Sequence, residues 1–160
     1  MPSFFPRHTI DVHLEEPAAF RRLSFSLVEM ALVTGVVLRL GRVLLHASSG
    51  WPFVAFFVLG TFLLLGMATA HLANFPIRQW AWRAPAFALL EAAGEMAASA
   101  ALIGLAREPL GSAGRAHWGD WPGMATATLG WRLAMVAVWS LLLAGVVTLV
   151  RRAMARRRRH

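Results

Sequence analysis

The chain has 160 residues, of which 58% are hydrophobic and only 15% are charged, and all sixteen basic residues are arginine. Soluble domains carry about a quarter charged residues, so this composition favours an integral membrane protein. The sequence has no cysteine, which excludes thiol redox chemistry and metal or iron–sulfur sites that depend on cysteine ligands. The net charge of +8 does not predict nucleic-acid binding, because no aromatic and basic platform or recognition helix accompanies it.

Residues 1–22 are predicted to form a cytoplasmic tail. They are polar, and no apolar core precedes a small-residue cleavage site, so no cleavable signal peptide is expected. Pro17 follows Glu15 and Glu16, and this order suits the first turn of a helix, where proline and negative charge are both favourable.

Four long apolar segments follow, at about residues 23–45, 51–73, 85–106 and 124–150. Each exceeds the roughly 20 residues that a helix needs to cross about 30 Å of hydrocarbon. The sequence therefore predicts an all-α membrane protein with one domain, residues 23–150, of four antiparallel transmembrane helices. Pro52 and Pro85 are expected to open the second and third helices, and Asp120 to cap the fourth.

The arginines are distributed asymmetrically between the two ends of these helices. Eleven fall on one side if the helices alternate: Arg7, Arg21, Arg22, Arg78, Arg83, Arg151, Arg152, Arg156, Arg157, Arg158 and Arg159. Only Arg107 and Arg115 fall in loops on the other side. By the positive-inside rule both termini are cytoplasmic, which predicts a multi-pass protein of a bacterial-type inner (plasma) membrane.

The basic tail, residues 151–160, is expected to contact anionic lipid headgroups at the cytoplasmic face. Each arginine near such a surface contributes about 1 kcal/mol. The predicted contacts are Arg151, Arg152, Arg156, Arg157, Arg158 and Arg159.

Helix association in lipid depends on small residues and polar contacts, because lipid tails are as apolar as leucine. The third segment is rich in alanine and glycine, so it is expected to lie in the middle of the bundle. Narrower contacts are predicted at Gly66–Ala70 and Gly130–Ala134. The bulky face of the second segment is expected to meet lipid or another subunit: Phe53, Phe56, Phe57 and Phe62.

Six ionisable residues lie within the four segments, with one histidine close to an end: Glu29, Arg39, Arg42, Glu91, Glu95, Arg132 and His71. A charge at mid-helix costs about 2.5–3.5 kcal/mol, so each needs a partner, a neutral form or water. At a rise of about 1.5 Å per residue, Glu95 and Arg132 reach similar depths and are predicted to pair. Arg39 either joins this pair or, like Arg42, extends to the outer headgroups.

A second layer is expected nearer the cytoplasm, because Glu29, His71 and Glu91 reach similar depths on three helices. Three interpretations fit these groups: an ion-pair arrangement that fixes helix register, a metal site, or a proton relay. They lack the Glu-x-x-His spacing of di-iron bundles. No metal ligand or catalytic residue is assigned from the sequence, and a cofactor, whether metal or pigment, stays open.

No phosphate loop, nucleophile elbow, zinc-protease or Walker pattern occurs. Together with short loops and the lack of a soluble domain, this favours a non-enzymatic accessory or assembly subunit of a larger membrane complex. Its expected partners are other membrane subunits, or copies of itself, and membrane lipids. The alternatives are a small oligomeric transporter or proton-conducting protein that uses the intramembrane glutamates and arginines, and an intramembrane enzyme with a carboxylate–histidine metal site.

Overall fold

The computed structural model describes residues 27–45, 50–110 and 114–157. These residues form four α-helices: α2 (Leu27–Leu44), α3 (Gly50–Ala73), α4 (Trp80–Gly104) and α5 (Trp121–Arg157), with a short 3-10 helix, η2 (Ile77–Gln79), before α4. The described ranges contain no β-strand, only an isolated bridge between Pro109 and Arg115. The predicted all-helical fold is confirmed. The predicted cytoplasmic tail, residues 1–22, and the last residues, 158–160, lie outside the described ranges.

Two helix boundaries differ from those expected. α4 begins at Trp80, five residues before Pro85, so Pro85 lies inside the helix instead of opening it. Proline near a helix start removes few intrahelical bonds, and the Trp80 indole Nε1 donates to the carbonyl of Phe75 (2.9 Å) to hold this end. α5 continues to Arg157, past the predicted end at residue 150, because alanine and arginine are strong helix formers.

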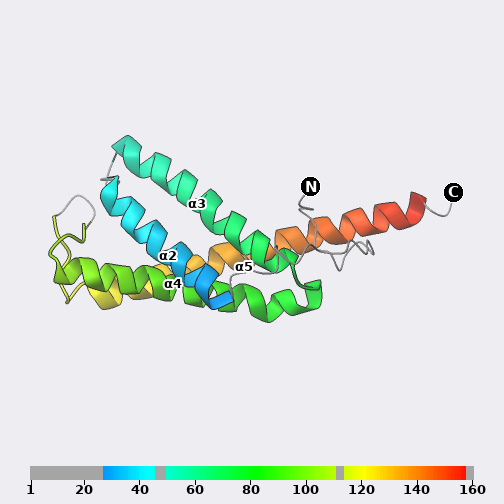
Figure 1. The fold of residues 1–160 in the computed structure, drawn as a ribbon. Helices are drawn as coiled ribbons and strands as arrows, with labels where there is room; N and C mark the ends of the chain where they lie inside the picture. The colour runs from blue at the N-terminus through cyan, green and yellow to red at the C-terminus, as the bar shows by residue number, and fades with distance from the viewer. Residues whose placement is uncertain (1–26, 46–49, 111–113, 158–160) are drawn as a thin grey trace, which may run out of the picture.

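Consecutive helices run in opposite directions (Figure 1). The end of α2 and the start of α3 lie at the same end of the molecule as the end of α4 and the start of α5, and the connection α3–α4 lies toward the C-terminal end of α5. α4 and α5 lie along one another, whereas α2 leans away from them toward its C-terminal end and α3 toward its N-terminal end (Figure 1). α5 has 37 residues, about 55 Å of helix, and its C-terminal part extends beyond the other helices.

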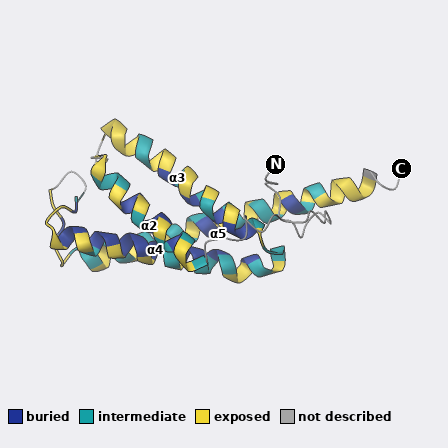
Figure 2. Cartoon of the chain, in the orientation of Figure 1, coloured by how far each residue is buried: buried dark blue, intermediate teal, exposed yellow. Residues whose placement is uncertain are grey.

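α4 is the most buried helix, as its small side chains predicted (Figure 2). Its buried face packs mainly against α2 and α5. Length and composition would allow three helical segments to cross a membrane: Gly50–Ala73, Ile77–Gly104 and Trp121–Arg156. The described part of the first predicted span, α2, is 18 residues long and includes Glu29, Arg39 and Arg42.

The close crossing of α2 and α4 is built on one glycine from each helix. A Cβ atom on Gly35 would overlap the carbonyl oxygen of Glu91 and lie 2.7 Å from the backbone nitrogen of Glu95. A Cβ atom on Gly94 would likewise overlap the carbonyl oxygen of Leu32. The two backbones therefore touch directly, which is the geometry that small residues permit between membrane helices.

The helix contacts predicted at Gly66–Ala70 and Gly130–Ala134 are wrong for this chain. A Cβ atom on either glycine would meet nothing within 4 Å, and both alanines are exposed. Spacing alone does not reveal which face of a helix meets a neighbour. The aromatic face of α3 does lie outward in part: Phe53, Phe57 and Phe62 are exposed, and Phe56 is half-buried.

Gly94→Val is expected to destabilise the protein strongly, because a branched side chain would force the α2 and α4 backbones apart. Overpacking a core costs about 1–3 kcal/mol where side chains can shift, and a backbone neighbour cannot shift as easily. The measurement is the midpoint of thermal unfolding in detergent. Gly66→Val is the matched control in an open position, and a similar loss in both variants would contradict the crossing.

Candidate functional site

The charged side chains of three helices and one loop meet in the interior of the molecule. Arg39 lies on α2 four residues after Gly35, on the same face of the helix, and Glu95 follows Gly94 on α4. The glycine crossing therefore places Arg39 against Glu95, and α5 supplies Arg132 from the other side of α4. We call this set, Arg39, Glu91, Glu95, Ser99, Glu108 and Arg132, the Arg–Glu network.

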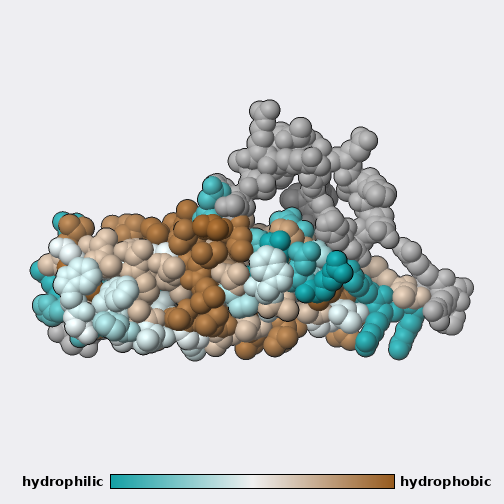
Figure 3. All heavy atoms as spheres, turned by 90° about the horizontal axis from the view of Figure 1, so that it is seen from below, coloured by the Kyte–Doolittle hydropathy of each residue, from teal (hydrophilic) through white to brown (hydrophobic). Residues whose placement is uncertain are grey.

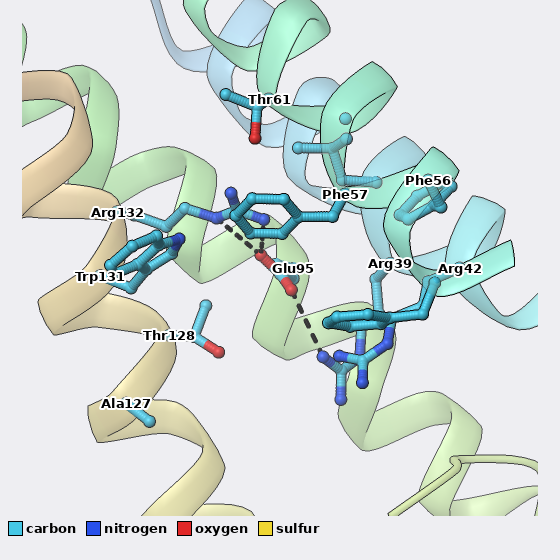
Figure 4. A pocket seen from close by; sticks show the side chains of 13 residues that line it. Arg39, Arg42, Phe56, Phe57, Thr61, Glu95, Ala127, Thr128, Trp131 and Arg132 are labelled. Carbon is cyan, nitrogen blue, oxygen red and sulfur yellow. Dashed lines mark hydrogen bonds and ion pairs between the residues drawn. The ribbon is translucent and has the colours of Figure 1, made fainter. Parts of the chain in front are cut away.

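Glu95 lies between two arginines (Figure 4). Its Oε2 accepts hydrogen bonds from Arg132 Nε (3.0 Å) and Nη2 (2.8 Å), and its Oε1 accepts one from Arg39 Nη1 (3.3 Å). The pairing of Glu95 with Arg132 that the depth estimate predicted is present, and Arg39 joins it. Hydrogen bonds between charged groups are stronger than neutral ones, so Glu95 links α2, α4 and α5.

Arg39 does not extend to the outer headgroups. Only 3% of it is exposed, and its Nη2 donates to Glu108 Oε1 and to Ser99 Oγ (3.4 Å). The guanidinium thus has three acceptors, two of them carboxylates. These neutralise a charge that lipid tails could not stabilise.

Glu108 is the member of the network that the sequence analysis missed. The end of α4 turns it inward: Ala106 has φ 54°, and Arg107 N donates to the carbonyl of Leu102 (2.8 Å), the arrangement that closes many helices. The loop then folds back, with Ala116 N donating to the carbonyl of Glu108 (2.9 Å), and Glu108 is 1% exposed. Glu108 lies just beyond the predicted third segment, 85–106, so the depth comparison within the segments did not include it.

Glu91 belongs to this network and not to a separate inner layer. It is fully buried, and Arg132 Nε lies 3.3 Å from its Oε2. Neither Glu91 oxygen has a hydrogen bond of good geometry. One turn of α4 separates Glu91 from Glu95, which is why Arg132 reaches both.

His71 and Glu29 differ from Glu91 in their surroundings. His71 is buried and packs against Phe87 (ring centroids 6.0 Å apart) and Phe75 (5.2 Å), whereas Glu29 is exposed on α2. Within the described part of the chain, no three histidine, aspartate or glutamate side chains are grouped so that they could hold a metal ion. The reading of Glu29, His71 and Glu91 as a metal site has no support among the described residues, and their similar depth stays a prediction.

A cavity of about 320 Å³ borders the network between α2, α3 and α5 (Figure 4). The ionisable side chains that line it are Arg39, Arg42, Glu95 and Arg132. Four aromatic side chains also line it, Phe53, Phe56, Phe57 and Trp131, and Phe57 packs against Trp131 (ring centroids 6.4 Å apart). The lining of the cavity therefore combines positively charged guanidinium groups with apolar aromatic rings.

The charges of this region balance only when Arg42 is included. Arg39, Arg42 and Arg132 face Glu91, Glu95 and Glu108, yet Arg42 forms no ion pair or hydrogen bond with another described residue. Its guanidinium lies 5.8 Å from the ring centroid of Phe53. Chemically, the network can hold three helices in register, and Arg42 can offer a positive charge to the cavity.

The chain matches no protein-family model, and no curated protein and no solved structure is significantly similar to it. The geometry of the network and of the cavity is therefore the basis for a functional assignment.

Glu95→Gln and Arg132→Gln are expected to be non-additive. Removing one partner destabilises the fold, because the remaining buried charge keeps only its second counter-ion: Glu91 for Arg132, or Arg39 for Glu95. The double variant removes both charges of this contact, so part of that loss is recovered. A double-mutant cycle measured by reversible unfolding in mixed micelles should give a coupling energy of about 1 kcal/mol or more. Glu95→Gln combined with Arg78→Gln, an exposed arginine before α4, is the control and should be additive. Additivity in both cycles would contradict the pairing.

Proposed function

We propose that the protein crosses a bacterial-type inner membrane four times, with both termini in the cytoplasm. The alternation of helix directions (Figure 1) and the eleven arginines assigned to one side support this topology. α2 is about 27 Å long, and burial of Arg39 against α4 removes from lipid one of the charges that would otherwise oppose its insertion.

The surface supports the same placement. Figure 3 shows a hydrophobic band across the middle of one face and hydrophilic residues gathered toward the end that carries the C-terminus of α5. Arg151, Arg152 and Arg156 are exposed there, where anionic headgroups would meet them. Of the other predicted headgroup contacts, Arg157 closes α5, and Arg158 and Arg159 lie outside the described residues.

Within this membrane the protein acts, in our proposal, as a non-enzymatic accessory or assembly subunit of a larger complex. The observation that carries the proposal is that the deep charges contact one another: Glu95 is held by two arginines, and Arg39 is held by two glutamates. Groups engaged in this way fix helix register and are not presented to a substrate as acid, base or nucleophile.

The outer faces of α3 and α5 are the surfaces offered to partner subunits. α5 places one apolar side chain after another on its exposed side: Val138, Leu141, Leu142, Val146 and Leu149. α3 does the same with Leu59 and Phe62. Large exposed apolar surfaces mark sites of lipid or protein contact, and α3 packs against its own chain far less than α4 does.

The topology predicts opposite accessibility for two single cysteines placed in this cysteine-free chain. Gly119→Cys, in the α4–α5 connection, should react with a membrane-impermeant maleimide in intact cells. Ala153→Cys, on the C-terminal part of α5, should react only after the cells are permeabilised. Labelling of both positions in intact cells, or the reverse pattern, would contradict the topology.

The accessory role predicts specific cross-links from the exposed face of α5. A photo-reactive residue at Leu141 should capture one defined membrane protein, whereas the same residue at Val136, which is buried against the protein's own helices, should not. Deletion of the gene should also lower the amount of the assembled complex that contains the captured protein. If Leu141 yields only lipid adducts or copies of this chain, and the protein purifies as a single homogeneous oligomer, the accessory role is wrong.

A further inference from the structure

We infer that the cavity between α2, α3 and α5 binds an anionic lipid of the outer half of the bilayer, with Arg42 as the contact for the lipid phosphate. This site is separate from the arginines at the cytoplasmic end of α5. The inference rests on the membrane insertion proposed above, and it does not depend on the accessory role.

The charge of the cavity favours an anion. Three guanidinium groups and one carboxylate line it, and that carboxylate, Glu95, is already engaged by Arg39 and Arg132. Glu91 and Glu108 contact the same two arginines but do not line the cavity. Arg42 is therefore the cation at this cavity that has no carboxylate within ion-pair distance among the described residues.

Two buried polar atoms at the cavity lack partners. Arg39 Nε and Arg42 Nε have no hydrogen-bond acceptor, although Arg39 is 3% exposed. A buried donor without an acceptor is costly where water is scarce. A phosphate oxygen is a strong acceptor with the geometry that a guanidinium prefers.

The remaining walls fit the apolar part of a lipid. Phe53, Phe56, Phe57 and Trp131 line the cavity, with the rings of Phe53 and Phe57 6.2 Å apart. A free inorganic anion would make no apolar contact with these rings. A lipid can contact both parts of the lining, because its acidic headgroup suits the arginines and its acyl chain suits the aromatic rings. The volume of about 320 Å³ lies at the lower end of small-molecule sites, so it fits the region around the phosphate and the adjoining chain rather than a whole lipid.

The position along the helices points to the outer leaflet. From the start of α3 at Gly50, Phe53 is about 5 Å along the helix and Thr61 about 17 Å, so the cavity runs from the interface toward the middle of the bilayer. Arg42 also borders a second cavity of about 390 Å³, lined by Arg107 and Arg115 from the α4–α5 connection. A phosphate on Arg42 would therefore lie near two further arginines at headgroup depth.

The test is native mass spectrometry of the detergent-purified full chain with equal amounts of phosphatidylglycerol and phosphatidylcholine. Wild type should retain phosphatidylglycerol at least tenfold over phosphatidylcholine. Arg42→Gln should reduce this preference about tenfold, the size expected from the loss of a charged hydrogen bond. Arg78→Gln, an exposed arginine far from the cavity, is the matched control and should leave the preference unchanged.

A second variant tests the cavity without changing its charge. Thr128→Phe should fill the space beside Trp131 and lower retention of phosphatidylglycerol while all the arginines remain, with folding checked by thermal unfolding. Three results would overturn the inference: equal retention of the two lipids, a preference unaffected by both variants and lost only in Arg151→Gln/Arg156→Gln, or full displacement of the lipid by millimolar inorganic phosphate. The second would show surface adhesion at the tail, and the third a site for a free anion.

Discussion

The contact on which this structure depends is the crossing of α2 and α4 at Gly35 and Gly94. Because neither glycine has a Cβ atom, the helix backbones touch. The side chains one turn after Gly35 on α2 and directly after Gly94 on α4 are therefore brought within bonding distance. Arg39 and Glu95 occupy those positions. The small residues and the charges are therefore not two separate means of association: the first sets the distance at which the second can form an ion pair.

The network also shows why so many charges can be tolerated in an apolar interior. An unpaired charge there would be expensive, but each carboxylate of the network has an arginine within 3.3 Å or less, and Arg39 and Arg132 each contact two carboxylates. Arg42 is the exception, and it borders the cavity. An acidic lipid at that place would give Arg42 the close anionic partner that no described side chain supplies, with the aromatic rings of α3 and α5 around its chain.

The helices fall into two kinds. α4 is buried on most sides and holds α2 and α5, whereas α3 and most of α5 present apolar side chains outward (Figure 2). A molecule with this division has a fixed interior and a large surface for lipid or neighbouring subunits. The proposed accessory role is based on this division, because Arg39, Glu95 and Arg132 contact one another inside the molecule, whereas the exposed sides of α3 and α5 are largely apolar.

Four features could be predicted from the sequence, because they follow from composition, periodicity and depth. They are the helical class, the approximate extents of the apolar segments, the central place of the alanine-rich helix and the Glu95–Arg132 pair. The sequence did not determine which glycines touch, since small-residue spacing at Gly66 and Gly130 is as good as that around Gly94. Nor did it show that Glu108, in the loop after α4, contacts Arg39, or that Arg132 contacts Glu91 as well as Glu95. Those outcomes depend on the rotation of each helix about its axis and on the turn at Ala106, which only the packing of the whole chain decides.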